Sequence, residues 1–286
     1  MSKNLELPAI PLNQMQDFVR SVTVAGMKEQ PIATATPAPF AFKGALGLHK
    51  GDRAYQQDQV ILIPHRLVPG CILGLVADGM GGKKGGRTAA QQAIQTARQL
   101  FITYSPFHDD PDQFLRQVAM ETHLIIGLTA ITSEEEPHTT FAGFLVQPSG
   151  QVHISHCGDS RVYLFRNKSL LYRTHDHSYV QTLIDSGQIT EEEARDHPKS
   201  NLVTSCLGIY LDQGPALSQY TSPRVRSGDV IMACSDGLWH GTTSQEIATI
   251  VNDYPPKDAC QMLVTQSYMR ADGYSDNISV CIVKVD

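Results

Sequence analysis

The stretch from Leu75 to Gly82 constrains this chain most, because an apolar run ends there in a carboxylate followed by a cluster of glycines. The run predicts a buried strand over residues 71–77 and then a sharp bend. A carboxylate at the end of a buried strand is poorly solvated, so a positive group normally lies beside it. The neighbouring glycine lets a backbone carbonyl approach a ligand closely. Asp78-Gly79 is therefore a candidate cradle for magnesium or manganese, although taken alone an ordinary Asp-Gly turn explains it better.

The composition is that of a globular protein. The chain has 286 residues, of which 41% are hydrophobic and 18% charged, enough for one large domain or two small ones. Its net charge of -6 and the lack of a long basic run argue against nucleic acid as the main partner. Six dispersed cysteines without a CxxC pair indicate neither a zinc cluster nor a disulfide framework, which fits a reducing cytoplasm. We expect no signal peptide and no membrane span.

The order of predicted elements indicates an α+β fold. Residues 1–40 resemble an N-terminal extension and linker because prolines gather near their end, and the globular pattern covers 41–286 as one domain. The second long helix carries Phe114, Val118, Leu124, Ile125 and Leu128 on its apolar side. Many short strands and two helix pairs favour a sandwich with helices packed outside. Strands are predicted over 42–48, 60–63, 71–77, 140–146, 151–156, 161–165, 169–172, 230–234 and 277–285, and helices over 87–101, 111–131, 179–186, 244–251 and 256–269.

Five aspartates stand at strand ends or in tight polar turns: Asp58, Asp78, Asp159, Asp236 and Asp276. Each one alone is more simply a turn or helix-capping residue. If they meet at one edge of a sheet, they repel one another at a cost of roughly several kcal/mol per unpaired buried charge. Two divalent cations would neutralise such a cluster and could activate water for phosphoryl transfer. Arg53 is then the natural bidentate phosphate ligand, with a plain surface arginine as the alternative.

The motifs that carry these aspartates resemble, in order, those of the metal-dependent serine/threonine protein phosphatases, the PPM or type 2C family, in its compact bacterial form. The resemblance covers roughly residues 42–286. As an ordered set the motifs are very specific, whereas each Asp-Gly pair alone is weak. The set consists of Arg53-x-x-Gln56-Gln57-Asp58, Val76-Ala77-Asp78-Gly79-Met80-Gly81-Gly82, Gly158-Asp159-Ser160-Arg161-x-Tyr163, Asp176-His177-Ser178, His197-Pro198, Cys234-Ser235-Asp236-Gly237-Leu238 and Asp276-Asn277.

The resemblance implies a sandwich of two antiparallel β-sheets flanked by helix pairs, in α-β-β-α layers. It also implies two core Mn²⁺ or Mg²⁺ ions and a weaker third ion. In this resemblance Asp78 bridges the two core ions, the Gly79 carbonyl binds one of them, and Asp236 and Asp276 complete the other. Asp159 with Asp236 holds the third ion. Arg53 binds the substrate phosphate, and Asp58 orients the attacking water. Residues 187–208 correspond to a flap beside the cleft, with His197 and Asn201 as its candidate site residues.

Three positions depart from the family pattern. Gln57 stands where the family often has Glu, so we expect at most a weaker second ion. Lys83 stands where the bacterial form commonly has His, which leaves the general acid unassigned. The following helix opens with Gly85-Gly86-Arg87 where an acidic residue is usual, and we interpret this as a local surface change.

The sequence therefore predicts a metal-dependent protein phosphatase that hydrolyses phosphoserine and phosphothreonine with metal-activated water. We expect it to be a cytoplasmic, monomeric signalling enzyme acting on the targets of a serine/threonine kinase. The alternatives are a catalytically silent phosphatase-like binding module and a two-metal phosphoesterase of small molecules. For protonation of the leaving alkoxide we favour a water on the third ion, held by Asp159, over His197.

Overall fold

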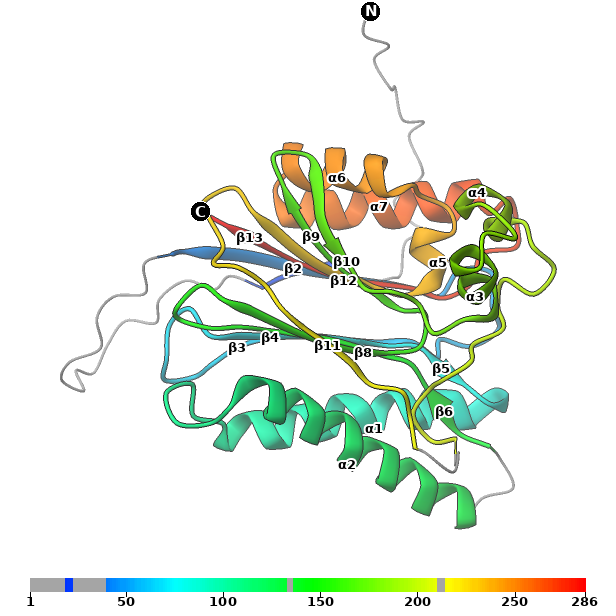
Figure 1. The fold of residues 1–286 in the computed structure, drawn as a ribbon, viewed down its shortest axis with the longest axis horizontal. Helices are drawn as coiled ribbons and strands as arrows, with labels where there is room; N and C mark the ends of the chain where they lie inside the picture. Colours follow the sequence, from blue (N-terminus) through cyan, green and yellow to red (C-terminus); the bar gives the residue numbers. More distant parts are fainter. Residues whose placement is uncertain (1–18, 23–39, 133–135, 210–213) are drawn as a thin grey trace, which may run out of the picture.

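The computed structural model of the chain describes residues 19–22, 40–132, 136–209 and 214–286. Two β-sheets lie face to face, with a pair of long helices on the outer face of each (Figure 1). The predicted α+β sandwich of two antiparallel sheets flanked by helix pairs is confirmed. No helix in the described part of the chain is long and apolar enough to cross a membrane.

The six-stranded sheet is antiparallel throughout and contains both ends of the described chain. Its order is β1-β2-β13-β12-β9-β10. The strands are β1 (Val19–Val22), β2 (Phe42–His49), β13 (Ile278–Val285), β12 (Val230–Cys234), β9 (Arg161–Arg166) and β10 (Ser169–Arg173).

The five-stranded sheet is also antiparallel, with the order β11-β8-β7-β4-β3. Its strands are β11 (Ser218–Thr221), β8 (Val152–Cys157), β7 (Phe141–Val146), β4 (Ile72–Ala77) and β3 (Gln59–Pro64). A two-stranded ribbon of β5 (Gly79–Met80) and β6 (His138–Thr139) extends it at the end where β4 stops.

The helices form the outer layers and one cap. In Figure 1, α1 and α2 lie below the five-stranded sheet, α6 and α7 above the six-stranded sheet, and the short α3, α4 and α5 at one end. Their bounds are α1 (Gly82–Thr103), α2 (Pro111–Thr132), α3 (Tyr179–Asp185), α4 (Glu191–Arg195), α5 (Asp236–Trp239), α6 (Ser244–Asp253) and α7 (Pro256–Arg270).

Central strands read as unbroken apolar runs because both of their faces are buried. On β12, Val230 and Met232 pack with α6 and α7, whereas Ile231 and Ala233 pack between the two sheets. The same alternation on β4 sends Leu75 toward α1 and α2 and its neighbour Val76 toward the other sheet. Successive side chains of a strand point to opposite faces, so one short segment supplies two cores at once.

Several predicted elements differ from the structure. α1 begins at Gly82, five residues before the predicted start, and the structure adds β5, β6, β11 and α5 to the prediction. Residues 19–22, inside the predicted extension, form the edge strand β1 on β2. The boundary at residue 40 remains a prediction.

The apolar side predicted for the second helix was wrong in its second half. Leu124, Ile125 and Leu128 are exposed, by 54%, 38% and 64% respectively. Phe114 and Val118 are buried as predicted, and in the second half Thr122, His123, Ile126 and Gly127 are the buried residues. The pattern misled because several apolar residues lie on both sides of this helix, so periodicity alone does not select a face.

We predict that Gly74→Ala destabilises the protein by about 1–3 kcal/mol, because an added methyl group overpacks a filled core. Gly74 pairs with Phe144 across β4 and β7, and a Cβ at Gly74 would collide with the Phe144 ring. Urea unfolding of the single variant and of Gly74→Ala/Phe144→Leu measures the effect, and the double variant should recover part of the loss. Equal stability of wild type and Gly74→Ala would show that the ring moves aside freely.

Candidate metal centre

Both sheets deliver their aspartates to the same end of the sandwich. Antiparallel pairing sets the start of one strand beside the end of its neighbour, so Asp58 before β3 lies beside Asp78 after β4. In the other sheet, Asp276 before β13 lies beside Asp236 after β12. Asp159 occupies the turn between β8 and β9, where the chain crosses from one sheet to the other. The structure therefore brings all five predicted carboxylates to one edge.

Asp58 is the most deeply buried of the five. Its side chain is fully buried, and neither carboxylate oxygen has a hydrogen-bond partner. Burial raises the pKa of Asp58 to about 7, and repulsion from Asp236 and Asp276 adds to the effect, whereas Ser235 and Ser279 oppose it. Both serine hydroxyls donate elsewhere, since Ser279 Oγ donates to Ser235 Oγ at 3.1 Å and Ser235 Oγ donates to the Asn277 carbonyl at 3.5 Å. A buried carboxylate with no donor requires a cation or a proton.

Asp78 lies at the centre of the cluster. Burial raises the pKa of Asp78 well above its usual range, and Asp58, Asp236, Asp159 and Asp276 all raise it further. Its backbone N–H donates to Thr140 Oγ1 at 2.9 Å, and its carbonyl accepts from the Thr140 N–H at 2.8 Å. These bonds hold the strand end in place while the side chain faces four other acids.

Thr140 also connects the strand end at Asp78 to the turn that carries Asp159. Its hydroxyl lies 2.7 Å from Ser160 Oγ, next to Asp159. Burial raises the pKa of Asp159 well above its usual range, and the charges of Asp236 and Asp176 raise it further. Gly158, at φ 104°, turns the chain here in a conformation that favours glycine, and a Cβ on it would meet Thr140 at 2.7 Å.

Arg53 is the cation at the mouth of the cluster. Its Nη2 donates to Asp276 Oδ2 at 2.6 Å, and its side chain is 62% exposed. Hydrogen bonding to Asp276 raises the pKa of Arg53, and the charges of Asp236 and Asp78 add to this. An arginine with one edge bonded and the rest in solvent is free to grip an incoming anion.

Gly79 is enclosed by backbone. A Cβ at this position would collide with the Gly86 carbonyl and lie 2.8 Å from the Gln57 carbonyl. Gly86 is buried, so our interpretation of Gly85-Gly86-Arg87 as a local surface change was wrong. The glycines let the first turn of α1 pack directly on the strand end that carries Asp78.

Gln57 fastens this arrangement to the last strand. Its backbone N–H donates to Asn277 Oδ1 at 2.6 Å, and its side-chain Nε2 donates to the Gly82 carbonyl at 2.8 Å. Asn277 in turn donates to the carbonyls of Lys50 and Tyr55. The side chain of Lys83 lies outside the described residues.

The candidate flap residues stand apart from the cluster. His197 Nδ1 accepts from the Lys199 N–H at 3.1 Å in the turn after α4, and Asn201 is exposed. Among the residues that the structure describes, no hydrogen bond or ion pair joins either of them to the five carboxylates.

The carboxylates fit a pair of hard cations. Asp58 and Asp236 both have buried carboxylate oxygens without a hydrogen-bond partner. Within the described ranges, no three His, Cys, Asp or Glu side chains converge closely enough to form a site from side chains alone. An ion here would therefore add backbone and water oxygens to the carboxylates, as magnesium does in proteins.

The sequence analysis missed Trp239 and His240, which follow Asp236 on α5. The indole Nε1–H of Trp239 donates to the Asp159 carbonyl at 3.0 Å. This bond joins the segment that carries Asp236 to the turn that carries Asp159. His240 Nδ1 lies 3.7 Å from Asp236 Oδ2. The i, i+4 spacing of Asp236 and His240 was the available signal, but it required a helix that the sequence did not predict.

A family model for protein phosphatase 2C matches residues 48–276. This chain belongs to the protein phosphatase 2C family. The match includes all five aspartates and every sandwich strand from β3 to β12, whereas β1, most of β2 and β13 lie outside it.

Relatives and solved structures agree. The chain is 30% identical over 218 residues to the serine/threonine phosphatase stp of Listeria monocytogenes, covering 74% of this chain and 84% of that protein. It is 29% identical to the protein phosphatase PhpP of Streptococcus pneumoniae, covering 74% and 85% respectively.

Among solved structures, the catalytic domain of the serine/threonine protein phosphatase PstP in complex with two manganese ions is similar at 27% identity. Its TM-score is 0.73, over 86% of this chain and 99% of that one. The serine/threonine phosphatase PstP/Ppp of Mycobacterium tuberculosis gives the same TM-score at 28% identity, over 85% and 98%. The predicted family and the predicted metal-dependent protein phosphatase are therefore confirmed.

We predict that Asp58→Asn stabilises the metal-free protein at pH 8 by on the order of 2 kcal/mol relative to wild type. The folded pKa of Asp58 is raised to about 7. The stability that this group contributes to the folded state is therefore fully present below the unfolded pKa near 3.8 and is lost as pH rises through 7. The gain should therefore shrink toward pH 5. Urea unfolding in a chelator at both pH values measures it, with the exposed Asp258→Asn as control. A gain that is the same at pH 5 and pH 8 would contradict this account.

Proposed function

We propose that this chain removes phosphate from phosphoserine and phosphothreonine residues of proteins. The observation that carries the proposal is the cluster of five aspartates at one end of the sandwich, with Arg53 at its mouth. The family membership and the names of the matched relatives support the same substrate class. We further propose a monomeric cytoplasmic signalling enzyme that opposes a serine/threonine kinase.

Each residue has a distinct part in this proposal. Asp78 would bridge two divalent ions, with the Gly79 carbonyl on one and Asp236 and Asp276 on the other. Asp159 would hold a weaker third ion with Asp236. Such ions supply a nucleophilic water at neutral pH and neutralise charge on the phosphoryl group. Manganese and magnesium both prefer these oxygen ligands, and the manganese in the similar PstP structure favours manganese here.

Asp58 and Arg53 act on the reacting groups directly. Asp58, as a buried carboxylate with two free oxygens, would accept a hydrogen bond from the attacking water and fix its direction. Arg53 would exchange its bond to Asp276 for the phosphate oxygens of the substrate, so its guanidinium supplies binding in the ground state. The Gln57 side chain donates a hydrogen bond to the start of α1. At the position where the family often has Glu, this residue would therefore have a structural role.

We predict that Asp78→Asn lowers kcat for a phosphothreonine peptide by at least about 100-fold at saturating manganese, because the ligand shared by two cations loses its charge. Steady-state kinetics across a manganese titration measures this, with Asp258→Asn on the surface of α7 as matched control. Near-normal turnover by Asp78→Asn would overturn the two-ion centre. Preferential hydrolysis of nucleotides or sugar phosphates by wild type would favour a small-molecule phosphoesterase instead.

A second prediction concerns the leaving group. Serine and threonine alkoxides need a proton to depart, whereas nitrophenolate leaves without one. We propose that this proton comes from a water on the weaker third ion that Asp159 would hold, and not from His197. Asp159→Ala should then lower kcat for a phosphothreonine peptide about tenfold or more beyond its effect on nitrophenyl phosphate. Equal losses on both substrates, with a peptide-selective loss in His197→Ala, would move the role to the flap.

A further inference from the structure

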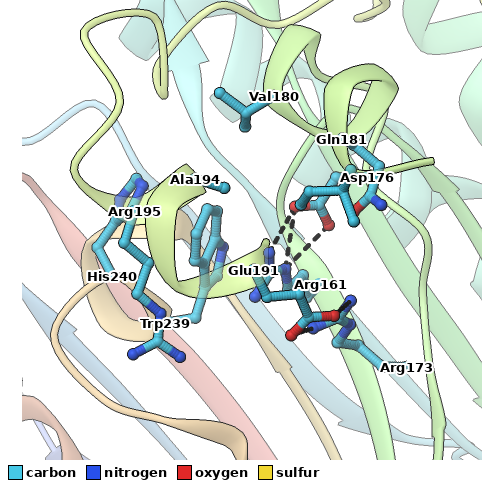
Figure 2. A pocket seen from close by; sticks show the side chains of 11 residues that line it. Arg161, Arg173, Asp176, Val180, Gln181, Glu191, Ala194, Arg195, Trp239 and His240 are labelled. Carbon is cyan, nitrogen blue, oxygen red and sulfur yellow. Dashed lines mark hydrogen bonds and ion pairs between the residues drawn. The ribbon is translucent and has the colours of Figure 1, made fainter. Parts of the chain in front are cut away.

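A small pocket lies between the flap helices and the core, next to the carboxylate cluster. Strands β9 and β10 give it Arg161 and Arg173, helices α3 and α4 give it Gln181 and Arg195, and the end of α5 gives it His240. Figure 2 shows these side chains converging from both sides of the pocket. Its volume is about 20 Å³, which is room for little more than one water molecule.

Two of the three arginines in the pocket are already neutralised. Arg161 forms a fork with Asp176, with Nη2 at 2.7 Å from Oδ2 and Nε at 2.9 Å from Oδ1, and its guanidinium lies 3.6 Å over the Trp239 ring. Arg173 Nη2 lies 2.9 Å from Glu191 Oε1. These pairs appear as the dashed lines in Figure 2 and form a rigid wall.

The third arginine is not paired. In the part of the chain that the structure describes, the Arg195 guanidinium has no hydrogen bond and no ion pair. His240 contributes a second unused group, because its Nε2 is buried and has no partner. In Figure 2 both side chains lie on the side of the pocket opposite the two ion pairs. The pocket thus has one positive charge in excess and an unsatisfied imidazole nitrogen.

We propose that this pocket binds the carboxylate of an acidic residue in the substrate protein, close in sequence to the phosphorylated serine or threonine. The inference rests on the proposed function, since it assigns a substrate preference to the same enzyme. Arg195 forms a charge-assisted hydrogen bond with the carboxylate, and His240 adds a second hydrogen bond when Nε2 carries a proton. Both bind the substrate and neither takes part in the chemical step.

Size selects a carboxylate over a second phosphate. About 20 Å³ admits one oxygen of a carboxylate, whereas a phosphate group would have to open the wall that Asp176 and Glu191 hold together. The rim is accessible, since the Glu191 side chain on α4 is 61% exposed. Asp176 and Glu191 would also repel the larger charge of a phosphate.

The pocket lies within reach of a substrate bound at the carboxylate cluster. His240 and Trp239 line the pocket and also reach the cluster: His240 Nδ1 is 3.7 Å from Asp236 Oδ2, and Trp239 Nε1 is 3.0 Å from the Asp159 carbonyl. An extended peptide advances roughly 3.3–3.6 Å per residue. We place the recognised acidic side chain within three residues of the phosphorylated position, with the phosphate at Arg53.

Paired peptides test the proposal. Phosphothreonine peptides with Glu at each of the three positions on either side are compared with the same peptides carrying Gln, and with a set carrying a second phosphoserine. At the preferred position, wild type should show a kcat/KM about tenfold higher for the Glu peptide than for the Gln peptide. The difference should come from a lower KM for the Glu peptide. Arg195→Gln should abolish this preference without changing kcat/KM for the Gln peptides or for nitrophenyl phosphate. Arg116→Gln, an exposed arginine on α2, is the matched control.

The only tryptophan of the chain provides a second readout, because Trp239 lines the pocket. The dephosphorylated Glu peptide should change its fluorescence in wild type and Arg116→Gln but not in Arg195→Gln. Equal kcat/KM for Glu and Gln peptides in wild type would overturn the pocket assignment and leave the phosphatase proposal intact. A preference confined to the second phosphoserine would overturn the choice of a carboxylate. Absence of turnover on every phosphopeptide by folded, manganese-loaded wild type would instead overturn the proposed function.

Discussion

The repulsion among five aspartates gathered at one end of the sandwich is the constraint on which the rest of this structure depends. Burial and mutual repulsion raise the pKa values of Asp58, Asp78 and Asp159, so the protein alone holds these groups at a cost in stability. The surrounding fold must supply that free energy. It does so with large apolar clusters between the two sheets and under each helix pair, so the strand ends stay fixed while like charges face one another.

Hydrogen bonds between uncharged groups hold the five aspartates together against their mutual repulsion. Thr140 joins the Asp78 strand end to the turn that carries Asp159, Asn277 joins Gln57 to the start of the last strand, and the Trp239 indole joins α5 to the Asp159 carbonyl. None of these links requires a cation. These links position the strand ends without using an ion, and a bound ion would relieve the repulsion among the carboxylates.

The pocket beside the cluster shows the opposite use of charge. Arg161 and Arg173 are bonded to Asp176 and Glu191, so the wall is stiff and nearly neutral, and only Arg195 is left to attract an anion. The preformed wall needs little reordering when an anion binds, so most of the ordering cost falls on the Arg195 side chain. In this arrangement the cluster provides the chemistry and the neighbouring pocket provides selection, with Trp239 and His240 between them.

The sequence by itself determined the elements that have one clear period and the residues that stand at their ends. Asp78, Asp236 and Asp276 were predicted from strand ends, and the α+β class followed from many short strands with two helix pairs. The chain order of the motifs then indicated the family. Only the tertiary structure decided which face of α2 is buried, because apolar residues such as Leu124 and Leu128 lie on both sides of that helix. It also decided that Gly86 packs against Gly79 in the interior, and that Arg195 and His240 line the same pocket although 45 positions separate them in the chain. Such contacts depend on which surfaces come together, and local sequence carries no record of its distant neighbours.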